Sequence, residues 1–262
     1  MFDVINDLDF SGYTLLVTCV SVGNISVMSA DLLIRSLKMK KSATCWHPAC
    51  TPITGVNPFG HNYQAERYSP KNYLTLLNTA LEIFHDPIKK IAVLQMRSPI
   101  TKVLKTEFIS DLVFFIRRQS FSKIFILSSC YSYKLAYLCD GVYNRTTAMR
   151  YTGNQKVIRL TKAFQESPNW QPYNANDDDS SLINSIPGCA KALYEKCLEK
   201  KLPVVLIFKY CTDGDNKDEA LVTLQIVNEL INVLNVKSDG PEILIPKSWK
   251  CLYGNVHPDN IY

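Results

Sequence analysis

The sequence predicts an α/β domain whose mostly parallel sheet is flanked by helices. Apolar runs of strand length alternate along the 262 residues with segments in which apolar side chains recur at helical spacing. The first apolar run, residues 15–20, ends in the turn Ser21-Val22-Gly23-Asn24, and an amphipathic segment follows at once. Strand, glycine turn and helix in this order are typical of α/β domains that bind nucleotides. The role of this turn is therefore the first question that the sequence raises.

Four apolar runs are expected to form buried strands. Their short length and nearly continuous apolar character favour central strands of a sheet that is covered on both faces. These runs are residues 15–20, 91–96, 123–129 and 204–210. Residues 74–84 are also apolar, and their pattern is compatible with either a helix or a strand.

Helical spacing predicts helices between these strands. The clearest predicted helix covers residues 101–119, where apolar side chains return to one face. A short helix is expected within residues 183–198. A further helix begins at Asp215 or Asn216, either of which can cap it, and runs to about Leu234.

The helix after the first strand is expected to begin at Asn24, which is suited to cap it. Apolar side chains then share one helix face: Met28, Leu32, Leu33 and Leu37. On another face, Asp31 and Arg35 have the i, i+4 spacing of an ion pair. The basic run Lys38-Met39-Lys40-Lys41 is predicted to be the solvated end of this helix.

Two long segments lack a clear periodicity. Residues 42–73 are rich in Pro, Gly, Asn and Tyr and are predicted to form a long loop with short extended pieces. Residues 139–180 are polar and are predicted to form an irregular, partly mobile excursion. Trp249 is expected to anchor the segment before a short tail at about 255–262. Since no linker or repeat divides the chain, we expect residues 1–262 to form one domain.

Charge and composition argue against several classes of protein. The net charge of +5 comes without a cluster of Lys and Arg interleaved with aromatic residues, so we expect no nucleic-acid partner. No apolar run reaches the length of about 18 residues that a membrane span needs, and Asp3 stands where a secretory signal would be basic. The nine cysteines are irregularly spaced, which favours free, buried thiols. We therefore expect a protein of the cytoplasm and nucleus that contacts no membrane.

The turn at Gly23 lacks the pattern that a phosphate-binding turn requires. A dinucleotide-binding turn uses three glycines, for the turn itself, for the approach of the pyrophosphate and for helix packing. Only Gly23 is present here, and the chain contains no Gly-Lys-Ser or Gly-Lys-Thr sequence of a P-loop. A tight connection between strand and helix is therefore favoured over a phosphate site.

Three side chains that could bind zinc lie close together in the chain, namely Cys45, His47 and Cys50. A structural zinc site uses four ligands, and the other candidates, His61 and Cys139, belong to no matching pair. An ordinary loop is therefore the favoured interpretation, and we expect no metal or other cofactor.

Residues at the ends of predicted strands are candidate catalytic groups. Ser128 and Cys130 lie where α/β enzymes hold active groups, but no nucleophile turn or partner-histidine motif accompanies them. The run Asp213-Gly214-Asp215-Asn216 resembles the start of a calcium loop, yet Leu224 takes the place of the last carboxylate. Arg97 can hold an anion or form an ion pair, of which the ion pair is favoured. The chain is therefore predicted not to be an enzyme.

Several segments, taken in order, resemble one family, that of proteasome assembly chaperone 2. Each segment is weakly specific by itself, but together they follow the family's order over residues 12–254. They are Gly12-Tyr13-Thr14-Leu15-Leu16, Val20-Ser21-Val22-Gly23-Asn24, Leu94-Gln95-Met96-Arg97-Ser98, Ile126-Leu127-Ser128-Ser129, Tyr131-Ser132-Tyr133, Ile186-Pro187-Gly188, Asp213-Gly214-Asp215-Asn216, Pro246-Lys247-Ser248-Trp249 and Tyr253-Gly254.

The resemblance implies a fold related to that of nucleoside phosphorylases, without their activity and without a cofactor. It implies a heterodimer with proteasome assembly chaperone 1 that binds the outer face of the α-subunit ring of immature 20S proteasome particles. There the pair is expected to promote α-ring formation and to prevent aberrant α-ring dimerisation. The alternative left open is a nucleoside-phosphorylase-like enzyme or a nucleotide-binding protein, because Arg97 and Ser128 stand at strand ends.

The resemblance also implies a C-terminal tail that inserts between neighbouring α subunits. The expected tail has a hydrophobic residue, a tyrosine and one further residue, whereas this chain ends in Ile261 and Tyr262. An apolar side chain, a phenol and a terminal carboxylate suit a pocket that holds a lysine. We expect Ile261 and Tyr262 to bind there in a shifted register or weakly, unless the given chain lacks a final residue. The alternative is a frayed terminus.

Overall fold

The computed structural model describes residues 9–59, 77–133, 149–173, 186, 188–237, 240–246, 248–249 and 252. Its elements in chain order are β1 (Thr14–Thr18), the 3-10 turn η1 (Val22–Asn24), α1 (Ile25–Leu37), β2 (Lys40–Thr44), β3 (Thr54–Val56), β4 (Leu77–Thr79), β5 (Leu81–Asp86), β6 (Ile91–Met96), α3 (Lys105–Arg118), β7 (Lys123–Tyr131), β8 (Met149–Gly153), α5 (Gln155–Leu160), α6 (Ala163–Glu166), β9 (Trp170–Pro172), α8 (Gly188–Glu199), β10 (Val204–Cys211), α9 (Lys217–Ile231), β11 (Val236–Lys237) and β12 (Gly240–Pro241).

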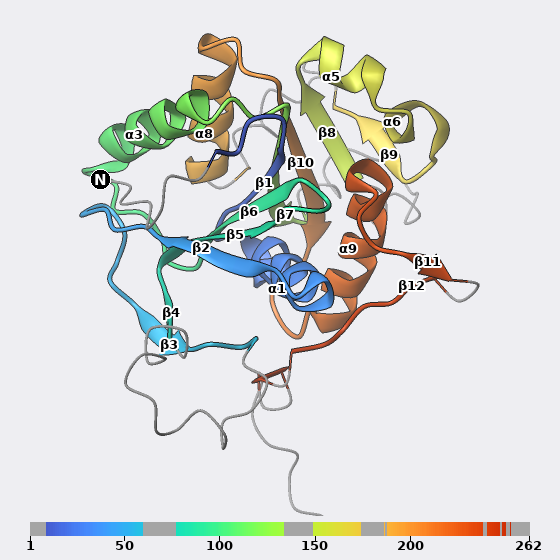
Figure 1. The fold of residues 1–262 in the computed structure, drawn as a ribbon, viewed down its shortest axis with the longest axis horizontal. Helices are drawn as coiled ribbons and strands as arrows, with labels where there is room; N and C mark the ends of the chain where they lie inside the picture. Colours follow the sequence, from blue (N-terminus) through green and yellow to red (C-terminus); the bar gives the residue numbers. More distant parts are fainter. Residues whose placement is uncertain are drawn as a thin grey trace, which may run out of the picture.

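Eight strands form one sheet in the order β2-β5-β6-β1-β7-β10-β8-β9. The four central strands β6, β1, β7 and β10 run parallel to one another. On one side β5 and β2 continue the sheet in antiparallel pairings, and on the other side β8 pairs antiparallel with β10. Helices cover both faces of this sheet (Figure 1). The predicted fold class, a mostly parallel sheet flanked by helices, is confirmed.

The central strands are buried on both faces because alternate side chains enter two different cores. One core lies between the sheet and the helices α3 and α8, and the other lies between the sheet and α1 and α9 (Figure 1). In β1, for example, Leu15 and Val17 belong to the first core and Leu16 belongs to the second. Burial on both sides explains why these strands are nearly continuous apolar runs in the sequence.

The end of α1 differs from the prediction. Lys38 has φ = +50°, and its N–H bonds back to the last helical turn, so α1 ends at Leu37. Lys40 and Lys41 then lie in β2, and Lys41 Nζ is 2.5 Å from a carboxylate oxygen of the buried Glu82. The predicted solvated helix end is therefore wrong for these two lysines, because a strand begins almost at once after the helix.

The described part of the ambiguous segment 74–84 is extended and forms β4 and most of β5. The helix predicted over 101–119 is α3, and the helix predicted to run to Leu234 is α9, which ends at Ile231. The sequence thus predicted which strands and helices exist better than it predicted the residues at which they begin and end.

None of the helices in the described ranges is long and apolar enough to cross a membrane.

The prediction of an irregular excursion over 139–180 is wrong for residues 149–173, which form β8, α5, α6 and β9. Strand β8 pairs with β10, and three aromatic rings from β8, α6 and β9 pack against one another. These rings are Tyr151, Phe164 and Trp170. The elements are too short to show a period in the sequence, and their aromatic side chains supply the core that orders them.

Candidate functional site

The carboxyl ends of the parallel strands bring together the segments that the sequence singled out. Because β1, β7 and β10 are neighbours and run in the same direction, the residues that follow them meet at one edge of the sheet. The turn at residues 21–24 follows β1, Ser128 and Ser129 lie near the end of β7, and residues 212–216 follow β10. This edge is therefore the candidate functional site.

The turn after β1 is held by side chains of the two neighbouring strands. The Ser129 hydroxyl lies 2.7 Å from Ser21 Oγ and 2.5 Å from the carbonyl oxygen of Val22, within hydrogen-bond distance of both. The Cys211 thiol donates to the same Val22 carbonyl at 3.3 Å, and Ser26 Oγ donates to the carbonyl of Cys19 at 2.5 Å. These polar groups bond to one another and to the backbone of the turn.

Gly23 is required in this turn for two reasons. Its φ is +60°, a left-handed conformation that costs a residue with a side chain about 1–2 kcal/mol. A Cβ atom at this position would also collide with the side-chain amide of Asn216 and approach the carbonyl oxygen of Thr212 to 3.0 Å. The Asn216 amide is itself fixed, because it donates to Thr212 at 3.0 Å and to Gly214 at 3.1 Å. The glycine thus allows close contact with the loop after β10.

The predicted capping roles are only partly correct. Asn24 occupies the N-cap position of α1 with φ = +52°, but its side chain makes no capping hydrogen bond, so the predicted cap is wrong in this respect. Asn216 occupies the N-cap position of α9 but likewise makes no side-chain capping hydrogen bond, whereas the carboxylate of Asp215 accepts from the N–H of Lys217 at 3.1 Å. The hydrogen bond with the Lys217 side chain lowers the pKa of Asp215. These residues begin a helix, as the sequence predicted, and do not serve a calcium loop.

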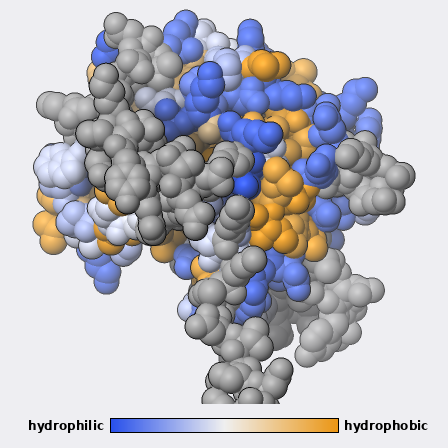
Figure 2. Space-filling view, turned by 60° about the horizontal axis from the view of Figure 1, so that its bottom comes forward, coloured by the Kyte–Doolittle hydropathy of each residue, from blue (hydrophilic) through white to orange (hydrophobic). Residues whose placement is uncertain are grey.

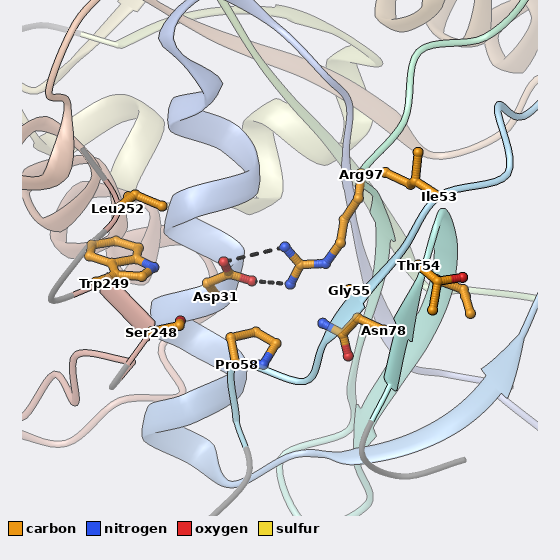
Figure 3. Close-up of a pocket in the computed structure, with 11 residues that line it drawn as sticks. Asp31, Ile53, Thr54, Gly55, Pro58, Asn78, Arg97, Ser248, Trp249 and Leu252 are labelled. Atoms are coloured by element: carbon orange, nitrogen blue, oxygen red, sulfur yellow. Dashed lines mark hydrogen bonds and ion pairs between the residues drawn. The ribbon is translucent and has the colours of Figure 1, made fainter. Parts of the chain in front are cut away.

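Arg97 forms the predicted ion pair, and its partner is Asp31. The Arg97 guanidinium donates to both carboxylate oxygens of Asp31 (Figure 3). Gln95 Nε2 donates to the same carboxylate at 2.8 Å, and Arg97 Nη2 donates to Gln95 Oε1 at 3.0 Å. Asp31 is thus buried in this network rather than on the outer helix face where the sequence paired it with Arg35. The Arg35 guanidinium donates to the carbonyl of Phe59.

A cavity of about 280 Å³ opens beside this ion pair, and Figure 3 shows the side chains that surround it. Apolar side chains make up much of its wall, including Ile53, Pro58 and Leu252. Trp249 also lines the cavity and is buried, which agrees with its predicted role as an anchor. The cavity thus combines a paired arginine with an apolar rim formed by segments that are far apart in the sequence.

The other candidate sites do not assemble. In the described part of the chain, no group of His, Cys, Asp and Glu side chains could hold a metal ion. Instead, His47 Nδ1 accepts from the N–H of Ala49 at 3.0 Å, and its ring packs on Phe108. Ser128 and Cys130 are both buried in the sheet. His61, Cys139, Ile261 and Tyr262 lie outside the described residues.

Sequence reasoning missed buried charged groups, among them Asp31 and Lys209. Asp31 stands within the apolar run Ala30-Asp31-Leu32-Leu33, and this unusual position was the signal that it is buried with a partner. Lys209 lies in the apolar strand β10, is buried, and forms an ion pair with Glu219 of α9 at 2.5 Å. In both cases, a charge in an otherwise apolar stretch indicated a paired, buried residue.

The sequence is similar to known proteins of one family. A model of the PAC2 family matches residues 15–243. The chain is 27% identical to "Proteasome assembly chaperone 2" of Homo sapiens over 266 residues, which cover 97% of this chain and 96% of the relative. It is 29% identical to the protein of the same name from Xenopus tropicalis over 269 residues, 98% of each chain.

Two solved structures from Pyrococcus furiosus share the fold. PbaA, described as an archaeal homolog of proteasome-assembly chaperone, superposes with a TM-score of 0.61 at 13% identity and covers 87% of this chain and 79% of its own. PbaB, described as an archaeal proteasome activator, superposes with a TM-score of 0.62 at 12% identity and covers 88% of each chain. At these identities, the two structures establish a common fold and nothing more.

We predict that Gly23→Ala lowers the free energy of unfolding by more than about 2 kcal/mol, because left-handed strain and the collision with Asn216 add together. Gly12→Ala is the matched control, since Gly12 has φ = +77° but open space around its Cβ position. This control should lose only about 1 kcal/mol. Urea denaturation of both variants measures the difference, and equal losses would contradict the close contact between Gly23 and Asn216.

We predict that Arg97→Met lowers the free energy of unfolding by about 3 kcal/mol, because the buried Asp31 carboxylate loses its cationic partner. Asp31→Leu combined with Arg97→Met should cost less than the sum of the single changes. Lys196→Met, which breaks an exposed pair with Glu199, is the control and should cost under about 1 kcal/mol. Additive effects in a double-mutant cycle, measured by denaturation, would show that the Asp31–Arg97 pair is not coupled.

Proposed function

Because the chain belongs to the PAC2 family, we propose that it is a proteasome assembly chaperone that acts by binding proteasome subunits rather than by catalysis. The observation that carries this proposal is the match of the family model over residues 15–243, together with full-length relatives named as proteasome assembly chaperone 2. The shared name gives the general role, and the structure supports the non-catalytic part of the proposal.

The carboxyl edge of the sheet supports a non-catalytic role. Enzymes with this architecture keep reactive side chains free at this edge to meet a substrate. Here the Ser129 hydroxyl donates to Val22 and the Asn216 amide to Gly23 in the turn after β1, and the Arg97 guanidinium is engaged by Asp31. The residues that an enzyme would use for chemistry are used here to hold the edge of the sheet together.

In its more detailed form, the proposal includes a partner and a target. We infer from the family that the chain pairs with proteasome assembly chaperone 1 and binds the outer face of the α-subunit ring. The pair would promote α-ring formation on immature 20S particles and prevent aberrant α-ring dimerisation. With this role, we expect the protein to act in the cytoplasm and the nucleus.

Exposed apolar side chains around the cavity beside Arg97 support a protein-binding role for this region. Ile53 and Leu252 line the cavity and remain 40% and 43% exposed. Figure 2 shows the face at the bottom of Figure 1, where a hydrophobic area is bordered by hydrophilic side chains. Exposed apolar side chains close to an arginine are typical of protein interfaces.

The C-terminal residues Ile261 and Tyr262 are proposed to reach a pocket between neighbouring α subunits. The side chain of Ile261 would supply an apolar anchor, and the phenol of Tyr262 would supply one hydrogen bond.

We expect co-expression with proteasome assembly chaperone 1 to yield a stable heterodimer that captures proteasome α subunits from a mixture of purified subunits. An exposed, unrelated helix-face variant such as Lys196→Met is the control and should capture them equally well. A stable monomer that ignores α subunits would falsify the proposal. Thermal stabilisation of the chain by a nucleoside together with phosphate would instead favour the nucleoside-phosphorylase-like alternative.

We predict that deletion of Ile261 and Tyr262 weakens binding to the α ring by roughly tenfold and leaves the heterodimer intact, because a small terminal anchor contributes about 1–2 kcal/mol. Titration of labelled heterodimer with α subunits measures the first effect, and size-exclusion chromatography measures the second. Replacement of Asn260 and Asp259 by alanine keeps the anchor and is the control. An unchanged affinity after the deletion refutes the proposed tail contact.

A further inference from the structure

Two cysteines meet where the end of β1 faces the start of α8. Cys19 directly follows β1 and is fully buried, whereas Cys189 is the second residue of α8 and is half-buried. Cys19 belongs to the core cluster against which Cys189 packs, and each thiol shifts the pKa of the other through a side-chain hydrogen bond. The sequence separates them by most of the chain, so only the fold makes them neighbours. The pair therefore consists of the accessible thiol of Cys189 and the buried thiol of Cys19 next to it.

A lysine lies beside the accessible thiol. Lys105 begins α3, and its ammonium nitrogen is 3.2 Å from the position that a Cβ atom would take at Gly188, the residue before Cys189. The hydrogen bond from Cys19 and the charge of Lys105 lower the pKa of Cys189, against the effect of its burial. For Cys19, the hydrogen bond with Cys189 and burial raise the pKa. The two pKa shifts thus run in opposite directions, which favours Cys189 as the attacking thiolate and Cys19 as its protonated neighbour.

Cys189 opens into a cavity of about 260 Å³ that carries positive charge. Its wall includes Val20, Ser98, Lys102, Lys105 and Gly188 besides Cys189 itself. Among the described residues, neither Lys102 nor Lys105 forms an ion pair with a carboxylate. A cavity with two cations and a thiol suits a small molecule that bears carboxylates and a sulfur atom.

A metal site is not the explanation for these cysteines. The third thiol nearby is Cys50, and burial raises its pKa to about 11, which keeps it protonated. In the described part of the chain, these thiols do not form a group that could hold a metal ion. The arrangement of one accessible thiol, one buried thiol and a cationic cavity remains, and it matches the requirements of thiol–disulfide exchange.

We propose that Cys189 is a site of thiol–disulfide exchange with small anionic disulfides, and that Cys19 resolves the mixed disulfide. In the first step, Cys189 Sγ attacks one sulfur of the disulfide R–S–S–R, forms a Cys189–S–S–R bond and releases RS⁻. In the second step, Cys19 Sγ attacks Cys189 Sγ, forms the Cys19–Cys189 bond and releases the other RS⁻. The two thiol protons pass to the two released thiolates, so two cysteines are oxidised and one small disulfide is reduced.

The exchange is tested on the full, reduced chain with glutathione disulfide as the anionic probe and cystamine as the cationic one. Differential alkylation with peptide mass spectrometry follows each cysteine. We expect Cys189 to react at least about tenfold faster than Cys197 of the same helix, whose burial raises its pKa to about 12. The wild-type product should be the Cys19–Cys189 disulfide, two hydrogen atoms lighter than the reduced chain.

Variants separate the roles of the three residues. Cys19→Ser should accumulate the mixed disulfide on Cys189, and Lys105→Met should slow the reaction with glutathione disulfide several-fold but slow that with cystamine less. Lys105→Arg should restore the rate. Equal reactivity of Cys189 and Cys197 in the wild-type chain would overturn the proposal without any variant. A Cys50–Cys189 disulfide, or a mixed disulfide as persistent in the wild type as in Cys19→Ser, would overturn the role of Cys19.

Discussion

The carboxyl edge of the sheet depends on one tight connection, the turn Ser21–Asn24 between β1 and α1. Gly23 adopts a left-handed conformation and leaves no room for a Cβ atom against Asn216, so the loop after β10 can pack directly on the turn. Ser129 of β7 holds the same turn by hydrogen bonds. Because the turn determines where α1 begins, it also determines where Asp31 lies over the sheet. The turn that suggested a nucleotide site is therefore an architectural element that joins three parallel strands.

Buried charges give this edge its second constraint. The Asp31–Arg97 pair is costly to desolvate, and an apolar pair of similar volume is often as stable. The hydrogen bonds that Gln95 adds leave this carboxylate fully engaged and give the pair one geometry. An α/β enzyme would leave such groups free for a substrate, whereas here they bond to one another. The same hydrogen bonds that fix the edge thus keep Asp31, Gln95 and Arg97 bonded to one another.

Prediction from the sequence succeeded where burial repeats along the chain. Residues 91–96 and 204–210 are buried on both faces, so their side chains are apolar without interruption and the strands are recognisable. It failed for residues 149–173, whose short elements are ordered by three aromatic rings and by pairing with β10. It also placed Asp31 on the wrong helix face, because the i, i+4 spacing to Arg35 records a local neighbour and not a partner on β6.

The sequence by itself determined the class of fold, the central strands, the main helices and the need for a tight turn at Gly23. Local patterns carry this information, because the burial of each side chain repeats with the period of its helix or strand. Only the tertiary structure decided that Gly23 meets Asn216, that Arg97 pairs with Asp31, and that two distant cysteines share a cavity wall with lysines. These contacts join residues far apart in the chain. Gly23 and Asn216, for example, are separated by 193 positions. The periodic spacing of apolar residues cannot predict such a contact, because the contact depends on the order of the strands in the folded sheet.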